Sequence, residues 1–233
     1  MRKVISALLS FLILMLLPVI AYADSEITVN GLGEIQIPAD IAFVSLGVSA
    51  QDHDVLQAQK KANETIAAVR AALIADGIAE QDINTDFINI YAMYDYSSGT
   101  EQLAAYNANS TLAIRVTDIE RVGEVIDLAF AAGANTLNGI SFSATDTSEA
   151  KNAAMRAAVE DAMAKAEVLA DAAGLEIRGV EEIVEHDTYS YDRGAKNNFA
   201  AQAAEDASGT VVQAAKLTVS SNVTVTFRTE KKS

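Results

Sequence analysis

Cysteine is absent from this 233-residue chain, and only two histidines occur. Without cysteine the protein has no disulfide framework, no thiol nucleophile, no thiolate metal site and no cysteine for a lipid anchor. Its stability must therefore come from burial of apolar surface and from association. His53 and His186 are far apart in the sequence, so we expect neither to bind a metal nor to act as a general base.

Positive charge is also scarce. The chain has 17 Lys and Arg against 32 Asp and Glu, a formal net charge of −15. Nucleic acid and anionic lipid headgroups are bound by clustered cations. The one local excess is Arg228, Lys231 and Lys232, which we interpret as a solubilising C-terminus, so no nucleic-acid partner is expected. Half of the residues are apolar, which is typical of a globular protein.

The N-terminus is typical of a secretory signal peptide. Arg2 and Lys3 precede an apolar run over residues 4–17, and Ala21-Tyr22-Ala23 follows Pro18. The run is shorter than the ~20 residues of a membrane-spanning helix. We predict a signal peptide over residues 1–23, cleavage between Ala23 and Asp24, and release of a soluble periplasmic protein. The alternative is an uncleaved segment that anchors a channel-like assembly to the membrane.

Cleavage would leave one domain over residues 24–233. It would remove two cations and no anion, so the net charge would change from −15 to −17. Alternation of apolar residues predicts strands, and helical spacing predicts three helices, closed by Gly77, Gly133 and Gly174. The strands are expected at 26–30, 34–37, 41–50, 82–95, 103–116, 136–144, 179–186 and 211–227, and the helices at 54–75, 119–131 and from Asp146 to residue 173. Asn30-Gly31-Leu32-Gly33 reads as a tight turn.

These elements do not alternate regularly, which favours an α+β fold with largely antiparallel sheets. A long Ala-, Asn- and Gly-rich loop is predicted over residues 187–210, before the last strand. A connection of this length is either mobile or ordered by a partner.

Catalytic motifs are lacking. The sequence contains no HExxH, CxxC or GxSxG, and Gly31-Leu32-Gly33 lacks the third glycine of a dinucleotide loop. Paired carboxylates can hydrolyse glycosides. The acidic cluster near one predicted strand end, however, is better interpreted as a solvated edge; it comprises Glu181, Glu182, Glu185 and Asp187. We therefore predict no catalytic, cofactor-binding or metal-binding residue, with a carboxylate-dependent periplasmic enzyme as the alternative.

Tyrosines are placed unevenly. Six remain after the predicted cleavage, in the predicted hairpin (Tyr91, Tyr94, Tyr96, Tyr106) and at the start of the long loop (Tyr189, Tyr191). Tyrosine is favoured at interfaces because its ring buries area while its hydroxyl stays hydrogen-bonded. Cross-strand packing within one subunit is an equally good explanation. The four hairpin tyrosines are the candidate self-association surface.

The order of several segments resembles the SIMPL-domain family, which includes the YggE-like proteins and the periplasmic immunogenic protein. The segments are Asn30-Gly31-Leu32-Gly33 with Pro38-Ala39-Asp40-Ile41-Ala42, Ala75-Asp76-Gly77-Ile78 with Asp82-Ile83-Asn84-Thr85, Val122-Gly123-Glu124-Val125-Ile126-Asp127, Gly133-Ala134-Asn135 with Asn138-Gly139-Ile140-Ser141-Phe142, Lys165-Ala166-Glu167-Val168-Leu169-Ala170, and Val223-Thr224-Val225-Thr226-Phe227. The resemblance implies an exported, often oligomeric α+β protein, loosely linked to oxidative or envelope stress, without an established catalytic activity.

Overall fold

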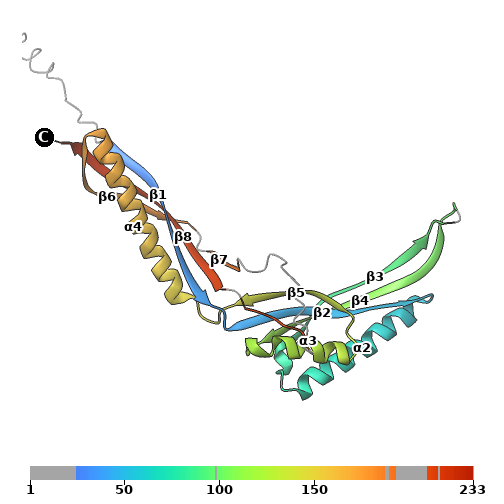
Figure 1. The fold of residues 1–233 in the computed structure, drawn as a ribbon. Coiled ribbons are helices and arrows are strands. Elements are labelled where there is room, and N and C mark those ends of the chain that lie inside the picture. The colour runs from blue at the N-terminus through green and yellow to red at the C-terminus, as the bar shows by residue number, and fades with distance from the viewer. Residues whose placement is uncertain (1–24, 98, 187–188, 193–208, 215, 233) are drawn as a thin grey trace, which may run out of the picture.

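The computed structural model describes residues 25–97, 99–186, 189–192, 209–214 and 216–232. Within them the chain forms two four-stranded antiparallel sheets and three α-helices, so the predicted α+β class is confirmed (Figure 1). The predicted signal peptide and the bond between Ala23 and Asp24 lie outside the described residues.

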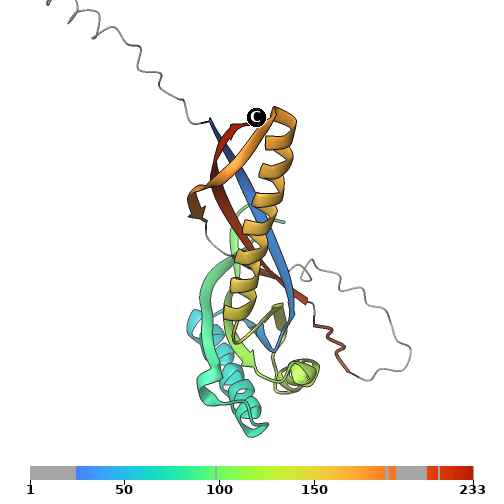
Figure 2. The same cartoon turned by 90° about the vertical axis from the view of Figure 1, so that its left-hand side faces the viewer.

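One sheet is built from both ends of the chain and is called here the terminal lobe. Its strand order is β1-β8-β6, and β7 also pairs with β8. A long helix, α4, covers one face, as the view in Figure 2 shows. The elements are β1 (Ser25–Pro38), α4 (Ser148–Ala173), β6 (Leu175–Glu185), β7 (Tyr189–Asp192) and β8 (Lys216–Lys231).

The other sheet is built from the middle of the chain and is called the central lobe. Its strand order is β3-β4-β2-β5, and two helices lie on one face while the other face is free of helices (Figure 1). The elements are β2 (Ile41–Asp52), α2 (Val55–Ala75), β3 (Ile83–Asp95), β4 (Gln102–Val116), α3 (Val122–Ala131) and β5 (Thr136–Ser143), with short 3-10 turns at Glu80–Asp82 and Ile119–Arg121.

The main core lies between the central sheet and its helices. As the alternation predicts, Ala42, Val44 and Leu46 of β2 point into it and are fully buried. They pack against α2 and α3, for example against Leu73 and Ile126. Complete burial of a side chain of this size contributes about 1.5–3 kcal/mol, so this face accounts for much of the lobe's stability.

The helix ends follow the sequence signals. Asp54 caps α2 by accepting hydrogen bonds from the amides of Leu56 (2.8 Å) and Gln57 (3.0 Å). Gly174 ends α4 in the left-handed conformation at φ 68°, which glycine adopts without steric cost. The third predicted helix is thus found with its predicted end.

The turn predicted at residues 30–33 is wrong. β1 runs without interruption from Ser25 to Pro38 and pairs with β8 along its whole length. The glycines are needed for close approach of the helix. A Cβ on Gly31 would lie 1.9 Å from the carbonyl oxygen of Ala158, and one on Gly33 would lie 2.0 Å from that of Ala154.

The predicted loop over residues 187–210 is wrong in part. Tyr189–Asp192 forms β7, which pairs with the start of β8. Residues 187–188 and 193–208 lie outside the described residues. The last predicted strand begins at Lys216 instead of residue 211, because residues 209–212 lie against the central lobe instead.

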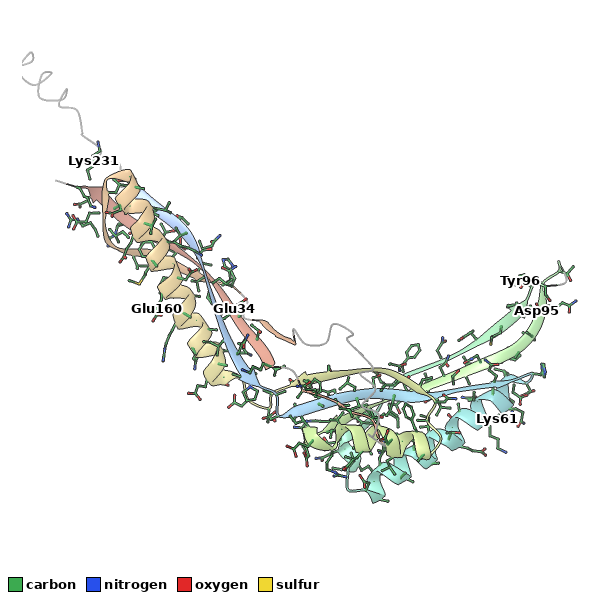
Figure 3. All side chains as sticks on the ribbon, viewed as in Figure 1. Glu34, Lys61, Asp95, Tyr96, Glu160 and Lys231 are labelled. Carbon is green, nitrogen blue, oxygen red and sulfur yellow. The ribbon has the colours of Figure 1, made fainter. Side chains whose placement is uncertain are left out.

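The two lobes give an elongated molecule. Figure 1 shows the C-terminus at the end of the terminal lobe and the β3–β4 hairpin at the opposite end. Figure 3 places Asp95 and Tyr96 at the tip of that hairpin and Lys231 at the far end of the other lobe. The hairpin therefore projects from the molecule, away from both chain ends of the described structure.

Candidate functional site

The β3–β4 hairpin presents the candidate tyrosines. Its tip is held by Asp95, whose carboxylate accepts a 2.8 Å hydrogen bond from the amide of Ser97. Hydrogen bonds from the amide and the hydroxyl of Ser97 lower the pKa of Asp95 below its ordinary value of 3.8. The carboxylate is therefore charged at neutral pH and fixes the chain just before the turn.

Three of the four tyrosines are exposed. Tyr91, Tyr94 and Tyr96 have 46%, 48% and 64% of their surface accessible, and Leu103, opposite Tyr94, has 48%. Tyr106 differs, since it is partly buried and packs against the cluster of Ala58, Ala62 and Ala108. The hairpin thus exposes three tyrosines to solvent and places the fourth in packing within the chain.

Two further exposed apolar residues, which the tyrosine argument missed, lie on the same strand. Phe87 and Ile88 are 55% and 58% exposed. Among the described strands β3 pairs with β4 alone, so its outer edge is open. The signal was present in the sequence as Phe-Ile-Asn-Ile-Tyr-Ala-Met, an uncharged seven-residue run over 87–93.

Two irregularities bound this run. The register of β3 against β4 shifts between Thr85 and Phe87 and again between Met93 and Tyr94. Between these bulges the residues pair regularly, from Phe87 with Thr111 to Met93 with Ala105. The open edge is therefore a regular strand of seven residues, which we call the β3 edge.

The central sheet is poor in charge. Its four strands contain only Asp52, Asp86, Asp95 and Arg115 as charged residues among 48, whereas 21% of the whole chain is charged. The core of a protein interface is depleted of charge and enriched in aromatic residues. The low charge of this sheet is thus compatible with contact with another protein.

The acidic cluster does not form an enclosed site. Glu181, Glu182 and Glu185 lie on β6 and are exposed to solvent. The carboxylate of Glu181 is 2.8 Å from Nε of Arg228 on β8. Asp187 lies outside the described residues. Paired-carboxylate chemistry requires one group in apolar surroundings, and the three described glutamates lack them.

The histidines and the acidic residues do not converge on a metal site. His186 Nε2 lies 2.8 Å from Oγ1 of Thr224, whose hydroxyl donates to Oδ1 of Asn30. Since that hydroxyl has one proton, His186 must be the donor to Thr224. In the part of the chain that the structure describes, no three His, Asp or Glu side chains form a group able to hold a metal.

A contact that the sequence argument did not predict joins the two lobes. The carboxylate of Asp127 on α3 accepts hydrogen bonds from the amide (2.9 Å) and the hydroxyl (2.5 Å) of Thr210. These bonds lower the pKa of Asp127. Val212 packs against the central core. We call residues 209–212 the strap, because they bind the central lobe just before β8 begins in the terminal lobe.

The backbone of the strap lies very close to the backbone of α3 at Gly123. A Cβ on Gly123 would lie 2.0 Å from the carbonyl oxygen of Thr210. Glycine at this position therefore lets the strap lie directly on α3. No local sequence pattern indicates this contact, since Asp127 and Thr210 are 83 residues apart.

The described helices are not membrane spans. None of them combines the length and the apolar character that crossing a bilayer requires.

Taken together, the fold is that of an α+β protein with two antiparallel sheets and a projecting hairpin that exposes aromatic and apolar side chains. The chain belongs to the SIMPL family, described as a protein of unknown function (DUF541), whose model matches residues 27–227. The predicted resemblance is thereby confirmed.

Curated relatives cover much of the chain. It is 31% identical over 166 residues to the 26 kDa periplasmic immunogenic protein of Brucella melitensis, covering 69% of this chain and 66% of that protein. It is 27% identical over 146 residues to the uncharacterized protein YggE of Escherichia coli K12, covering 63% of this chain and 59% of YggE. The chain thus spans about two thirds or less of these relatives' length.

Proposed function

We propose that this protein is exported to the periplasm and acts there without catalysis, as a homo-oligomer assembled through the β3–β4 hairpin. The observation that carries the proposal is the exposure of three tyrosines on a hairpin that projects from the molecule. Each such ring can bury a large area with little loss of conformational freedom. The low charge of the central sheet supports the same surface.

Location is supported by two independent features. The Brucella relative carries the word periplasmic in its name. The first 23 residues have the cationic start, apolar run and small-residue site of a signal peptide. N-terminal sequencing of the protein recovered from the periplasm tests this: Asp24 as first residue is expected. Recovery of the uncut chain in the membrane fraction would favour the anchored alternative.

Assembly is tested by light scattering coupled to size exclusion on residues 24–233. We expect an oligomer, and we expect substitution of Tyr91, Tyr94 and Tyr96 by threonine to weaken it. The matched control replaces Val168 and Leu169 of α4 by alanine, since these side chains are 69% and 48% exposed but lie in the other lobe. A strict monomer at all concentrations would contradict the proposal.

Tyr106 gives a further test of the surface. Because it is partly buried against α2, Tyr106→Ala should lower the free energy of unfolding of each subunit, as loss of a packed ring does. Urea denaturation combined with light scattering separates this effect from the effect of the exposed tyrosines. An unchanged midpoint together with dissociation would assign Tyr106 to the interface instead.

The proposal includes a role under oxidative or envelope stress, which the family resemblance implies. Survival of a deletion strain under peroxide, restored by the intact chain but not by the triple tyrosine variant, is the expected outcome. Restoration by the triple variant would separate the stress role from assembly. An enzyme acting through Glu182 and Glu185 is the competing proposal, and loss of rescue on changing both to glutamine would favour it.

A further inference from the structure

We propose that the β3 edge is the pairing strand of the assembly, and that its partner is the same strand of a second copy, antiparallel about a two-fold axis. This inference rests on the proposed function and names the contact within it. The two copies would join their central sheets into one eight-stranded sheet. Backbone hydrogen bonds would provide the main contact and the exposed apolar side chains would close over it.

Unlike β3, the other sheet edges in the described structure have features that prevent pairing with another strand. β1 carries Glu26 and Glu34 and ends at Pro38. β6 has charged residues along its length, among them Glu182 and Glu185. Charge and proline are the usual means by which proteins prevent edge-to-edge association. The fourth edge, β5, is uncharged, but it has only eight residues.

The β3 edge is the opposite case. It has seven regular residues without charge, and its nearest charged neighbours are Asp86 and Asp95, at or beyond the bulges. An exposed, regular and apolar edge strand is a site of strand pairing. The presence of this uncharged edge in an otherwise acidic chain therefore indicates that another strand pairs with it in the functional protein.

A second copy fits because the run is self-complementary. In an antiparallel pair about a two-fold axis, each residue faces its mirror position in the run. Centred on Asn89, the pairs are Phe87 with Tyr91 and Ile88 with Ile90; centred on Ile90, they are Phe87 with Met93, Ile88 with Ala92 and Asn89 with Tyr91. Apart from Asn89, which faces its own copy or Tyr91, both registers match apolar or aromatic residues, and neither places like charges opposite each other. Such cross-strand pairs stabilise sheets.

The faces also match. Phe87 lies opposite Thr111, which lies opposite Gly47 of β2, on the face away from the buried side chain of Leu46. Tyr91 lies on the same face, opposite Asn107. A two-fold axis normal to the sheet keeps this face common to both copies. The aromatic rings of the two copies would therefore meet on one side and the helices would lie on the other.

Charge selects this contact over others between copies. Each copy of residues 24–233 has a formal net charge of −17, so most surfaces of two copies repel each other. The central sheet, with four charged residues among 48, is where that repulsion is weakest. A second copy can therefore approach closely at this edge with little electrostatic cost.

Cysteine crosslinking tests the pairing directly, because the chain contains no cysteine of its own. Single variants Phe87→Cys, Asn89→Cys, Ile90→Cys and Tyr91→Cys are oxidised in dilute solution. At the two-fold axis a residue faces its own copy at about 4.5–5.5 Å between Cα atoms, which a disulfide can bridge. A residue two positions from the axis is displaced from its copy by four residues, about 13 Å, and cannot be bridged.

The expected result is strong self-crosslinking at Asn89→Cys or at Ile90→Cys and a sharp fall at the variants that lie two or more residues from that position. Ile183→Cys on β6, where the wild-type side chain is 50% exposed, is the matched control and should not crosslink. Equal crosslinking at all positions would indicate random collision and would overturn the inference. Crosslinking only in a mixture of Asn89→Cys with Ser141→Cys would show head-to-tail pairing of β3 with β5, and would also overturn it.

Lysine variants give the second measurement. Ile88→Lys places one cation from each copy within one or two residues of the proposed axis, and we expect self-association to weaken by about tenfold or more. Ile183→Lys adds the same charge to the other lobe and should leave assembly unchanged. Circular dichroism and urea denaturation test whether both variants fold. We expect that they do, because both wild-type side chains are exposed.

The outcomes separate the two proposals. An oligomer that persists in Ile88→Lys and shows no self-crosslink along 87–93 would overturn the pairing while leaving assembly in place. A wild-type chain that is strictly monomeric would overturn both.

Discussion

At the scale of single residues, two glycines of β1 set the distance between α4 and its sheet. The helix presents Ala150, Ala154, Ala158, Ala162, Ala166 and Ala170 to the strands, all of them buried. Alanine methyl groups on the helix, and the lack of a side chain at Gly31 and Gly33 of the strand, allow the two backbones to approach closely. The carbonyl oxygen of Ala154 occupies the position where a Cβ on Gly33 would lie.

Gly33→Ala should therefore destabilise the protein. A methyl group 2.0 Å from a backbone oxygen forces strand and helix apart, and overpacking of this kind costs typically about 1–3 kcal/mol. Urea denaturation measures the change. Gly139→Ala on β5 is the control, since no atom lies within 4 Å of its added methyl group, and it should stay within about 0.5 kcal/mol of wild type. Equal stability of both variants would contradict this explanation.

These residues also show where sequence analysis fails. The alanine spacing correctly predicts a helix that approaches a sheet closely. The facing glycines predict a turn instead, because Asn-Gly in a short strand pattern favours a hairpin. Local sequence does not distinguish a glycine needed for a turn from one needed for a neighbour, since the neighbour, Ala154 or Ala158, is more than 100 residues away.

At the scale of elements, the strap joins α3 of the central lobe to the segment that leads into β8 of the terminal lobe. The β3–β4 hairpin and α3 belong to the central lobe by their local contacts, and both could be predicted because each is continuous in sequence. The strap contacts Asp127 of α3. Its residues, 209–212, span the end of the predicted loop and the start of the last predicted strand. Nothing in the run from 209 to 212 indicates a partner on a helix so distant in sequence.

Asp127→Asn should loosen the strap. The carboxylate accepts two hydrogen bonds from Thr210. An asparagine amide can accept only one of them, because its NH₂ group would face the other donor of Thr210. We therefore expect the free energy of unfolding to fall by about 1–3 kcal/mol at pH 7. Urea denaturation measures it, and hydrogen exchange of the Thr210 amide should accelerate. Glu124→Gln, an exposed change on the same helix, is the control and should have little effect.

The same contact predicts a pH dependence. The hydrogen bonds lower the pKa of Asp127 in the folded state below its ordinary value of 3.8. Stability from this group is therefore fully present above that value and is lost as the pH falls through the lowered pKa. The difference in stability between wild type and Asp127→Asn should shrink as the pH is lowered below about 4. A difference that stays constant down to pH 2 would contradict the charged contact.

At the scale of the whole molecule, a high negative charge is combined with one sheet that is almost free of charge. The composition predicted the first property and the structure adds the second. An acidic surface favours solubility, and under the proposed pairing the uncharged sheet would make association selective. Sequence counting could find the uncharged run over 87–93, but only the strand order shows that β3 lies at an edge.

Self-association should therefore strengthen with salt. Screening shortens the range of repulsion between two copies from about 30 Å at 0.01 M to about 8 Å at 0.15 M, while an apolar contact is little affected. Sedimentation or light scattering at these two ionic strengths measures the effect. An interface held by ion pairs would show the reverse, with dissociation as salt is added.

The pairing of β1 with β8 has a consequence for the order in which the protein matures. Ser25 lies beside Thr229, so the first strand of the described chain has its partner in the last. The central lobe can fold from segments that are neighbours in the sequence, whereas β1 stays unpaired until β8, the last strand, is available.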